Sequence, residues 1–132
     1  MGIKYIWDTN TAIYFLQQQF PLRAEKFMDN LLREGLPCIS VITEIELLCW
    51  KTATEKDLEV LQSFISDALV IELERPVKLK TAEIRKQHRI KLPDAIIAAT
   101  AIVFGLTLIT RNIKDFEKIP ELTIINPWEP PT

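Results

Sequence analysis

The sequence has few glycines, histidines and cysteines, and each shortage excludes a class of functional site. Its 132 residues include three glycines, two cysteines and a single histidine, His88. No glycine-rich phosphate loop or G-x-G-x-x-G dinucleotide loop can be written from these glycines. One histidine excludes a zinc enzyme with two or three histidine ligands, and a ribonuclease that uses two histidines as acid and base. An enzyme with this sequence therefore has to use carboxylates.

The sequence also lacks an excess of charge and a long hydrophobic run. The 16 Lys and Arg residues nearly balance 18 Asp and Glu residues, and a net charge of −2 gives no sign of a nucleic-acid partner. No apolar run reaches the roughly 20 residues that span a bilayer, and the N-terminal one is too short for a signal peptide. We therefore expect a single domain over residues 1–132, located in the cytoplasm and without a membrane partner.

The two cysteines and the histidine carry no chemistry in this interpretation. Cys38 and Cys49 are too few for a disulfide framework, so we expect both to be buried, reduced thiols. His88 lies among charged residues in the segment RKQHRIK and is expected to be solvated.

Short apolar segments alternate with helical patterns along the chain. Strands are expected at residues 3–7, 38–41, 69–73, 106–109 and 122–125. A first helix is expected after Asp8 and ends near residue 19, and a second spans 21–35. Two further helices begin at 43 and 54, and the last two span 76–90 and 93–104. The tail at 127–132 is expected to be extended. This order predicts an α/β fold: a three-layer α/β/α sandwich around a mostly parallel sheet of about five strands.

Acidic residues follow the carboxyl ends of the expected strands. Asp8 comes directly after the first strand, Glu44 and Glu46 follow the second, and Asp115 follows the fourth. Asp94 begins the apolar helix at 93–104. Strand carboxyl ends and helix N-termini meet at the ligand-binding edge of such a sheet, so we expect these acids to lie together.

Each acid also has an ordinary structural use. Asp8 and Asp94 can cap helices, Thr43 and Glu46 match a capping box, and Asp115 can belong to a turn. If these acids lie together, however, carboxylates about 5 Å apart repel by roughly 3 kcal/mol per pair. This cost exceeds the stabilisation of about 1 kcal/mol that a helix cap provides. A divalent cation reverses that cost, and oxygen ligands suit Mg²⁺ or, as a substitute, Mn²⁺.

At these residues the sequence resembles the PIN-domain family, in particular the toxin ribonucleases of VapBC toxin–antitoxin modules. Four segments between Ile6 and Pro120 carry the resemblance: IWDTNTAIYFL, ISVITEIELL, LPDAIIAATAIVFGLTLITRN and KDFEKIP. The resemblance implies a PIN-like fold and a magnesium-dependent endoribonuclease that is the toxin of a type II pair. Metal-activated water would cleave the RNA phosphodiester and leave 5′-phosphate ends.

The resemblance also implies which acids act. Asp8, Glu46 and Asp94 match the first three acidic positions of the family, and Asp8 and Asp94 are expected to hold the metal. The fourth position is Asn112, a departure from the acidic pattern, and Asp115 is expected to complete the site. Further residues are expected near the metal or the phosphate: Asn10, Ser40, Glu44, Thr110, Arg111, Asn112 and Lys114.

The expected partners are RNA, a cognate antitoxin and a second copy of the chain. Tyr14, Phe15 and Trp50 can supply apolar contacts to protein partners, or can pack in the core. Residues 75–91 contain seven Lys and Arg against one acid, Glu83. This basic segment either contacts RNA phosphates or forms a solvated helix face.

Parts of the sequence also fit two other functions. Asn112 at an acidic position favours a catalytically impaired PIN-like module that only binds RNA or a partner. A phosphoacceptor signalling domain would need an Asp at the end of the third strand and a Lys at the end of the last. Those strands end in Glu72-Leu73-Glu74 and Ile125-Asn126, which disfavours this alternative.

Overall fold

A five-stranded parallel sheet forms the middle of the molecule, in a computed structural model that describes residues 3–131. The strands are β1 (Tyr5–Trp7), β2 (Cys38–Ser40), β3 (Leu69–Ile71), β4 (Thr107–Ile109) and β5 (Ile124–Ile125). Their order across the sheet is β3-β2-β1-β4-β5, and every neighbouring pair is parallel. The α/β class expected from the sequence is therefore confirmed.

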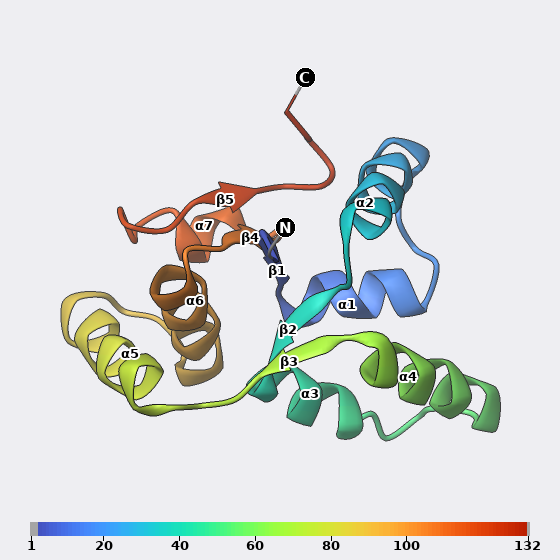
Figure 1. Cartoon of the computed structure of the whole chain (residues 1–132), viewed down its shortest axis with the longest axis horizontal. Helices are drawn as coiled ribbons and strands as arrows, with labels where there is room; N and C mark the ends of the chain where they lie inside the picture. The colour runs from blue at the N-terminus through green and yellow to red at the C-terminus, as the bar shows by residue number, and fades with distance from the viewer. Residues whose placement is uncertain (1–2, 132) are drawn as a thin grey trace.

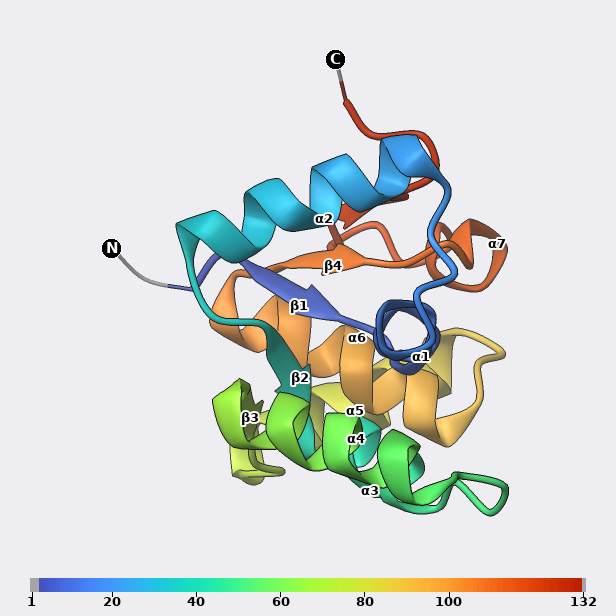
Figure 2. The ribbon, with the colours of Figure 1, turned by 90° about the vertical axis from the view of Figure 1, so that its right-hand side faces the viewer.

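Helices cover both faces of this sheet and make the three layers. They are α1 (Thr9–Leu16), α2 (Leu22–Glu34), α3 (Val41–Leu48), α4 (Glu55–Asp67), α5 (Arg75–Gln87), α6 (Leu92–Phe104) and α7 (Ile113–Phe116). Helices α1, α2 and α4 lie on one side of the strands, and α5 and α6 lie on the other (Figure 1). In the view of Figure 2, β1 and β4 point the same way, and α1 begins at the tip of β1.

The strands alternate between two hydrophobic clusters, one on each face. Ile6 and Leu108 pack with the buried face of α6, whereas their neighbours Trp7 and Ile109 pack with α1, α2 and α4. Successive side chains of a strand point to opposite faces, so three-residue strands contribute to both clusters. Because helices cover both faces of the sheet, these strands are apolar along nearly their whole length.

Helix α6 lies close on the sheet because its buried positions are small. Ala95, Ala98, Ala99 and Ala101 are fully buried and bring the backbone of α6 near the strands. Gly105 ends the helix in the left-handed conformation, with φ at 66°, as its position in the sequence predicts. No helix in residues 3–131 is long and apolar enough to cross a membrane.

Several element boundaries differ from those expected. Helix α1 ends at Leu16 instead of near residue 19, and Gln18 takes a left-handed backbone with φ at 54°. Helix α5 ends at Gln87, three residues before the expected end, because residues 88–91 turn the chain into α6. Residues 113–116 form the short helix α7, which the sequence pattern did not predict.

The tail and two side chains also differ from expectation. The tail was expected to be extended, but residues 127–129 form a turn in which the Glu129 N–H donates to the Asn126 carbonyl at 3.0 Å. Cys38 is buried, which raises the pKa of its thiol to about 12, whereas Cys49 at the end of α3 is exposed. His88 is half-buried at the end of α5 instead of fully solvated.

Candidate active site

Asp8 lies at the carboxyl edge of the sheet and is only 5% exposed. Trp7 is paired with Ile39 on β2 and Ile109 on β4, so the residues that follow all three strands lie side by side. One Asp8 oxygen accepts the Thr11 backbone N–H at 2.8 Å, which makes Asp8 the N-cap of α1. The other accepts the Thr110 hydroxyl at 2.5 Å. Asp8 thus has a structural use and a fixed orientation at the site edge.

Asp94 approaches Asp8 from α6, which covers the other face of the sheet. It is the third residue of α6, so it lies in the first turn of that helix and is not its N-cap. Burial raises the pKa of the Asp94 carboxyl, and repulsion from Asp8, Asp115 and Glu46 raises it further, while Lys91 opposes the shift. Burial is also the main cause that raises the pKa of Asp8. The four acids therefore form one cluster at the sheet edge, which we call the acidic pocket, in which their charges repel.

Glu46 reaches this pocket from α3 and is held by α1. The Thr9 hydroxyl donates to the Glu46 carboxylate at 2.5 Å and lies 3.1 Å from the Thr43 hydroxyl. The expected capping box at Thr43 and Glu46 is wrong, because α3 begins two residues earlier and Ser40 is its N-cap. Thr43 is instead buried inside the helix. The role of Thr9 was not predicted, and its position directly after Asp8 was the only signal for it.

Asp115 is fixed in the pocket by Asn112. The Asn112 side-chain amide donates to the Asp115 carboxylate at 2.8 Å, across the turn that leads into α7. The Asn112 backbone N–H donates to the Thr110 hydroxyl at 2.9 Å. Thr110 and Asn112 therefore link Asp8 and Asp115 through one short segment after β4.

Other residues expected near the site differ in placement. The Ser40 hydroxyl accepts the Ile42 N–H at 3.1 Å and is fully buried, so it caps α3. Glu44 is half-buried and is not among the charges that act on Asp94. Two residues apart on a helix point in nearly opposite directions, so Glu44 and Glu46 cannot both face the pocket. Asn10 is exposed on the first turn of α1.

The two cations after β4 are both exposed. Lys114 lies on α7, next to Asp115. The Arg111 guanidinium lies over the ring of Trp128, 4.5 Å from its centroid, and donates to the Tyr14 hydroxyl at 3.4 Å. The contribution of Trp128 was missed, because the tail that carries it was expected to be extended.

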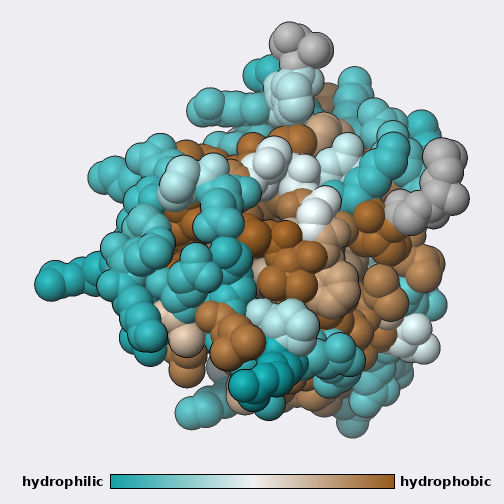
Figure 3. Space-filling model, turned by 60° about the vertical axis from the view of Figure 1, so that its left-hand side comes forward, coloured by the Kyte–Doolittle hydropathy of each residue, from teal (hydrophilic) through white to brown (hydrophobic). Residues whose placement is uncertain are grey.

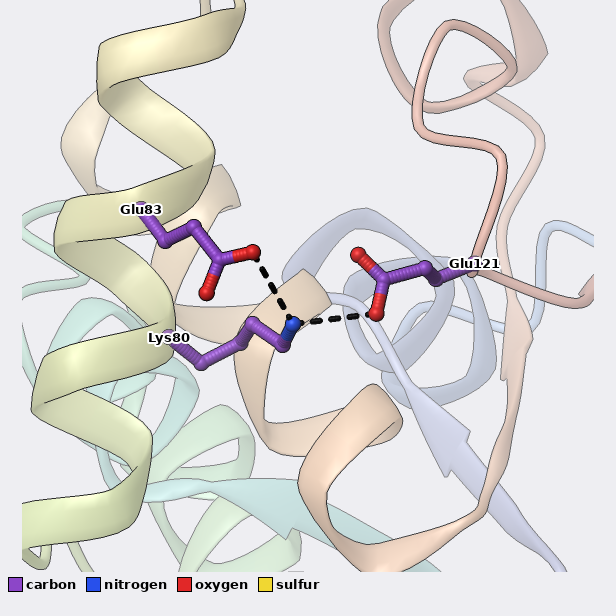
Figure 4. Close-up of polar contacts among 3 residues, drawn as sticks. All are labelled: Lys80, Glu83 and Glu121. Atoms are coloured by element: carbon purple, nitrogen blue, oxygen red, sulfur yellow. Dashed lines mark hydrogen bonds and ion pairs between the residues drawn. The ribbon is translucent and has the colours of Figure 1, made fainter.

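The basic segment at 75–91 is partly used within the fold. Lys80 binds Glu121 at 2.9 Å and Glu83 at 3.4 Å, and so ties α5 to the loop before β5 (Figure 4). The Arg85 side chain donates to the Ile90 carbonyl at 3.2 Å and holds the turn into α6. Lys91, by contrast, is exposed and close enough to Asp94 to oppose the rise of its pKa. The end of this segment nearest α6 therefore borders the acidic pocket.

The residues of the pocket fit a hard divalent cation. Within residues 3–131 no three acidic, histidine or cysteine side chains are close enough to form a ready metal cluster. The available donors are nevertheless carboxylate oxygens of Asp8, Asp94, Glu46 and Asp115, which is the donor chemistry of Mg²⁺ and Mn²⁺. The mutual repulsion at Asp94 is the electrostatic condition that a bound cation relieves.

Known proteins share both this sequence pattern and this fold. The family model for the PIN domain matches residues 5–122. A relative from Salmonella typhimurium, named as a tRNA(fMet)-specific endonuclease VapC, is 33% identical over 92% of this chain and 96% of its own. A ribonuclease VapC2 from Haemophilus influenzae is 30% identical over 94% of this chain and 98% of its own. The solved structure of VapBC2 from Rickettsia felis, bound to a promoter DNA fragment, superposes with a TM-score of 0.80 at 27% identity, over 94% of this chain and 98% of that one.

Proposed function

The chain belongs to the PIN-domain family as a nuclease of the VapC type, and from this premise we propose that it cleaves RNA with Mg²⁺ as the toxin of a type II toxin–antitoxin pair. The observation that carries the proposal is the group of acids at the sheet edge, where burial, followed by repulsion from Asp8, Asp115 and Glu46, raises the pKa of Asp94. Such repulsion costs stability beyond what the cap at Asp8 returns, and it therefore supports a site arranged for a cation.

Asp8 and Asp94 are the proposed metal ligands. When bound, Mg²⁺ supplies an activated water and offsets charge on the phosphoryl oxygens. Asp8 is oriented by Thr110 and Thr11, and its two oxygens keep further lone pairs for a ligand. Glu46, held by Thr9, and Asp115, held by Asn112, complete the acidic lining. Fixed orientation of this kind is what a metal site needs from its surroundings.

The alternative of an impaired binding module depended on Asn112. In the structure the Asn112 amide donates to Asp115, the acid expected to complete the site. Asn112 thereby orients a carboxylate instead of leaving a gap in the pocket. Its presence therefore does not favour loss of catalysis.

We also propose an antitoxin partner that binds the side of the molecule formed by α1, α2 and α4. Two neighbouring hollows there share the side chains of Phe15, Leu16 and Val60. Phe15 is half-buried and packs edge-on against Trp7 at 5.3 Å, so it serves the core and the hollow together. An amphipathic helix of a partner fits such an apolar groove.

A homodimer would use a different surface. Ile45 and Leu48 on α3 and Leu79 on α5 are 49%, 61% and 57% exposed. Figure 3 looks onto the side that carries α5 and α6 and shows hydrophobic surface surrounded by hydrophilic side chains. We propose that a second copy of the chain covers part of this surface. We also propose that each chain folds as a single domain.

The two glutamates of α3 offer a matched test of the proposed pocket. Glu46→Gln should lower the cleavage rate by about tenfold or more, because it removes a charge held at the pocket. Glu44→Gln, two residues away, should leave the rate unchanged because Glu44 is not among the groups that act on Asp94. Rates of metal-dependent cleavage of a structured RNA measure both effects. Equal rates for the two variants would remove Glu46 from the site.

The chemistry of the RNA ends tests the function as a whole. Brief induction of the chain in cells should stop growth and create new RNA ends with 5′-phosphate, because attack by water needs no 2′-hydroxyl. Co-expression of the protein encoded next to its gene should prevent both effects. Sequencing of 5′-phosphate RNA ends checks the expectation. Products with 2′,3′-cyclic phosphate, or normal growth without new ends, would contradict the proposed function.

A further inference from the structure

Arg111 is held beside the acidic pocket by aromatic side chains. Its guanidinium carbon lies 4.5 Å from the ring centroid of Trp128 and 5.9 Å from that of Tyr14. One of its N–H groups donates to the Tyr14 hydroxyl at 3.4 Å. Arg111 stands between Thr110, which binds Asp8, and Asn112, which binds Asp115. The aromatic contacts therefore hold the positive charge of Arg111 next to the two residues that bind Asp8 and Asp115.

The tail residue Trp128 is itself fixed in place. Its backbone N–H donates to the Asn126 side-chain oxygen at 3.0 Å. Its indole packs edge-on against Tyr14, at 4.8 Å between ring centroids, and Phe20, at 5.4 Å. The residue before Asn126 ends β5, where the Ile125 carbonyl accepts the Thr110 N–H at 3.0 Å. The turn at 126–129 is thus anchored to the same edge of the sheet as the pocket.

Arg111 stays unneutralised although four carboxylates are nearby. Across residues 3–131 the ion pairs involve Lys80 alone, so Arg111 is not paired with Asp8, Asp94, Glu46 or Asp115. An arginine that entered the pocket would occupy the place of a cation. Stacking on an aromatic face prevents this, and the N–H groups of the planar guanidinium fork that do not donate to Tyr14 stay free to bind a phosphate through two hydrogen bonds. Arg111 is exposed, so that fork is open to an incoming strand.

We propose that Trp128 is a positioning residue that holds Arg111 at the rim of the acidic pocket to bind an RNA phosphate next to the one that is cut. This inference rests on the proposed ribonuclease function. It assigns a role to the tail after β5, which neither the resemblance nor the pattern of acids involves. The simpler alternative is that the aromatic cluster of Tyr14, Phe20 and Trp128 only stabilises the fold. Arg111 would then pack on this cluster without binding RNA.

Binding of a short fluorescein-labelled single-stranded RNA separates the two possibilities. The measurement is made in an Asp94→Asn background, so that the RNA is not consumed, over a range of salt concentrations. Arg111→Ala should weaken binding by about tenfold, since it removes a charge-assisted pair. The slope of log affinity against log salt should fall by about 0.7, the value for one lost phosphate contact on a single strand.

Trp128→Leu keeps an apolar side chain but removes the aromatic face, and it should reproduce both effects of Arg111→Ala. The double variant should bind no more weakly than either single variant, because Trp128 acts through Arg111. Trp128→Phe restores an aromatic face and should restore most of the affinity. Trp50→Leu is the matched control for loss of an indole: Trp50 is half-buried and contacts Thr52, and its loss should leave affinity and slope unchanged.

The salt slope is the decisive measurement, because a purely structural role of Trp128 would not change it. An unchanged slope and affinity in folded Trp128→Leu, or a double variant weakened by the product of the two single effects, would overturn the inference. Should Trp128→Leu not fold by circular dichroism, Arg111→Lys replaces it, since it keeps the charge but lacks the planar fork. Full affinity in Arg111→Lys would count against the proposal. If the unsubstituted chain cleaves RNA while these variants bind normally, only the inference fails; if it neither binds nor cleaves RNA, the proposed function fails as well.

Discussion

Asp94→Asn should abolish RNA cleavage and at the same time make the metal-free protein more stable. In the folded chain, burial and the charges of Asp8, Asp115 and Glu46 all oppose ionisation of Asp94. The amide of asparagine is nearly isosteric and uncharged, so the substitution removes this repulsion. We expect a gain of roughly 1 kcal/mol in the free energy of unfolding, after allowance for screening by solvent. The cleavage rate should fall by about a thousandfold or more, since several kcal/mol of metal-assisted stabilisation would be lost.

Asp57→Asn is the matched control for the stability effect. Asp57, like Asp94, is the third residue of a 13-residue helix, but it belongs to the capping box of α4 and binds the Thr54 N–H at 2.9 Å. Its substitution should lower stability by about 0.5–1 kcal/mol and leave cleavage unchanged. Thermal unfolding without metal measures both variants. A loss of stability in Asp94→Asn as large as in Asp57→Asn would mean that Asp94 is an ordinary helix-terminal residue.

Added Mg²⁺ provides a second comparison within the same experiment. A ligand that binds only the folded state raises its stability with concentration, so the unsubstituted chain should unfold at higher temperature as Mg²⁺ is added. Asp94→Asn should lose most of this rise, and Asp57→Asn should keep it. Equal responses of all three proteins would indicate that the cation binds elsewhere.

The parts of the structure that depend on local pattern could be predicted from the sequence. The alternation of apolar strands with helices predicts a parallel sheet, and the order of the strands seen in the structure places residues after β1, β2 and β4 at one edge. Gly105 predicts the end of α6 because only glycine readily takes its left-handed conformation. The closeness of Asp8 and Asp94, 86 positions apart, follows from topology, since α6 returns to the edge at which β1 ends.

The parts that depend on side-chain choice between equivalent partners could not be predicted. Ser40 and Thr43 are both good N-caps, and only the end of β2 at Ser40 decides that α3 starts there. That start determines which glutamate of α3 faces the pocket. The position of Trp128 could not be predicted either, because its contact with Tyr14 joins residues more than a hundred positions apart, and that contact places Trp128 against Arg111.

Thr110→Val should destabilise the protein and impair the proposed site together. Thr110 is fully buried, and its hydroxyl donates to Asp8 and accepts the Asn112 N–H. Valine has nearly the same shape but leaves a buried carboxylate oxygen and a backbone N–H without this partner. Loss of a hydrogen bond to a buried charged group costs about 1.5–3 kcal/mol. Burial raises the pKa of Asp8, and the hydrogen bond from Thr110 opposes that rise. Without this hydrogen bond the pKa of Asp8 should rise further, so the charged form of Asp8 becomes less favourable.

Thr110→Ser is the control, since serine keeps the hydroxyl and loses only a methyl group. It should retain cleavage close to that of the unsubstituted chain and lose about 1 kcal/mol of stability through the smaller buried side chain. Thr110→Val should lose a further 10- to 100-fold in cleavage, the usual effect of removing a partner that orients a metal ligand. Urea unfolding and cleavage rates, measured where both variants are fully folded, separate the two effects. If Thr110→Val and Thr110→Ser cleave RNA at the same rate, the hydroxyl does not orient Asp8 for catalysis, and the contact serves only to join β4 to α1.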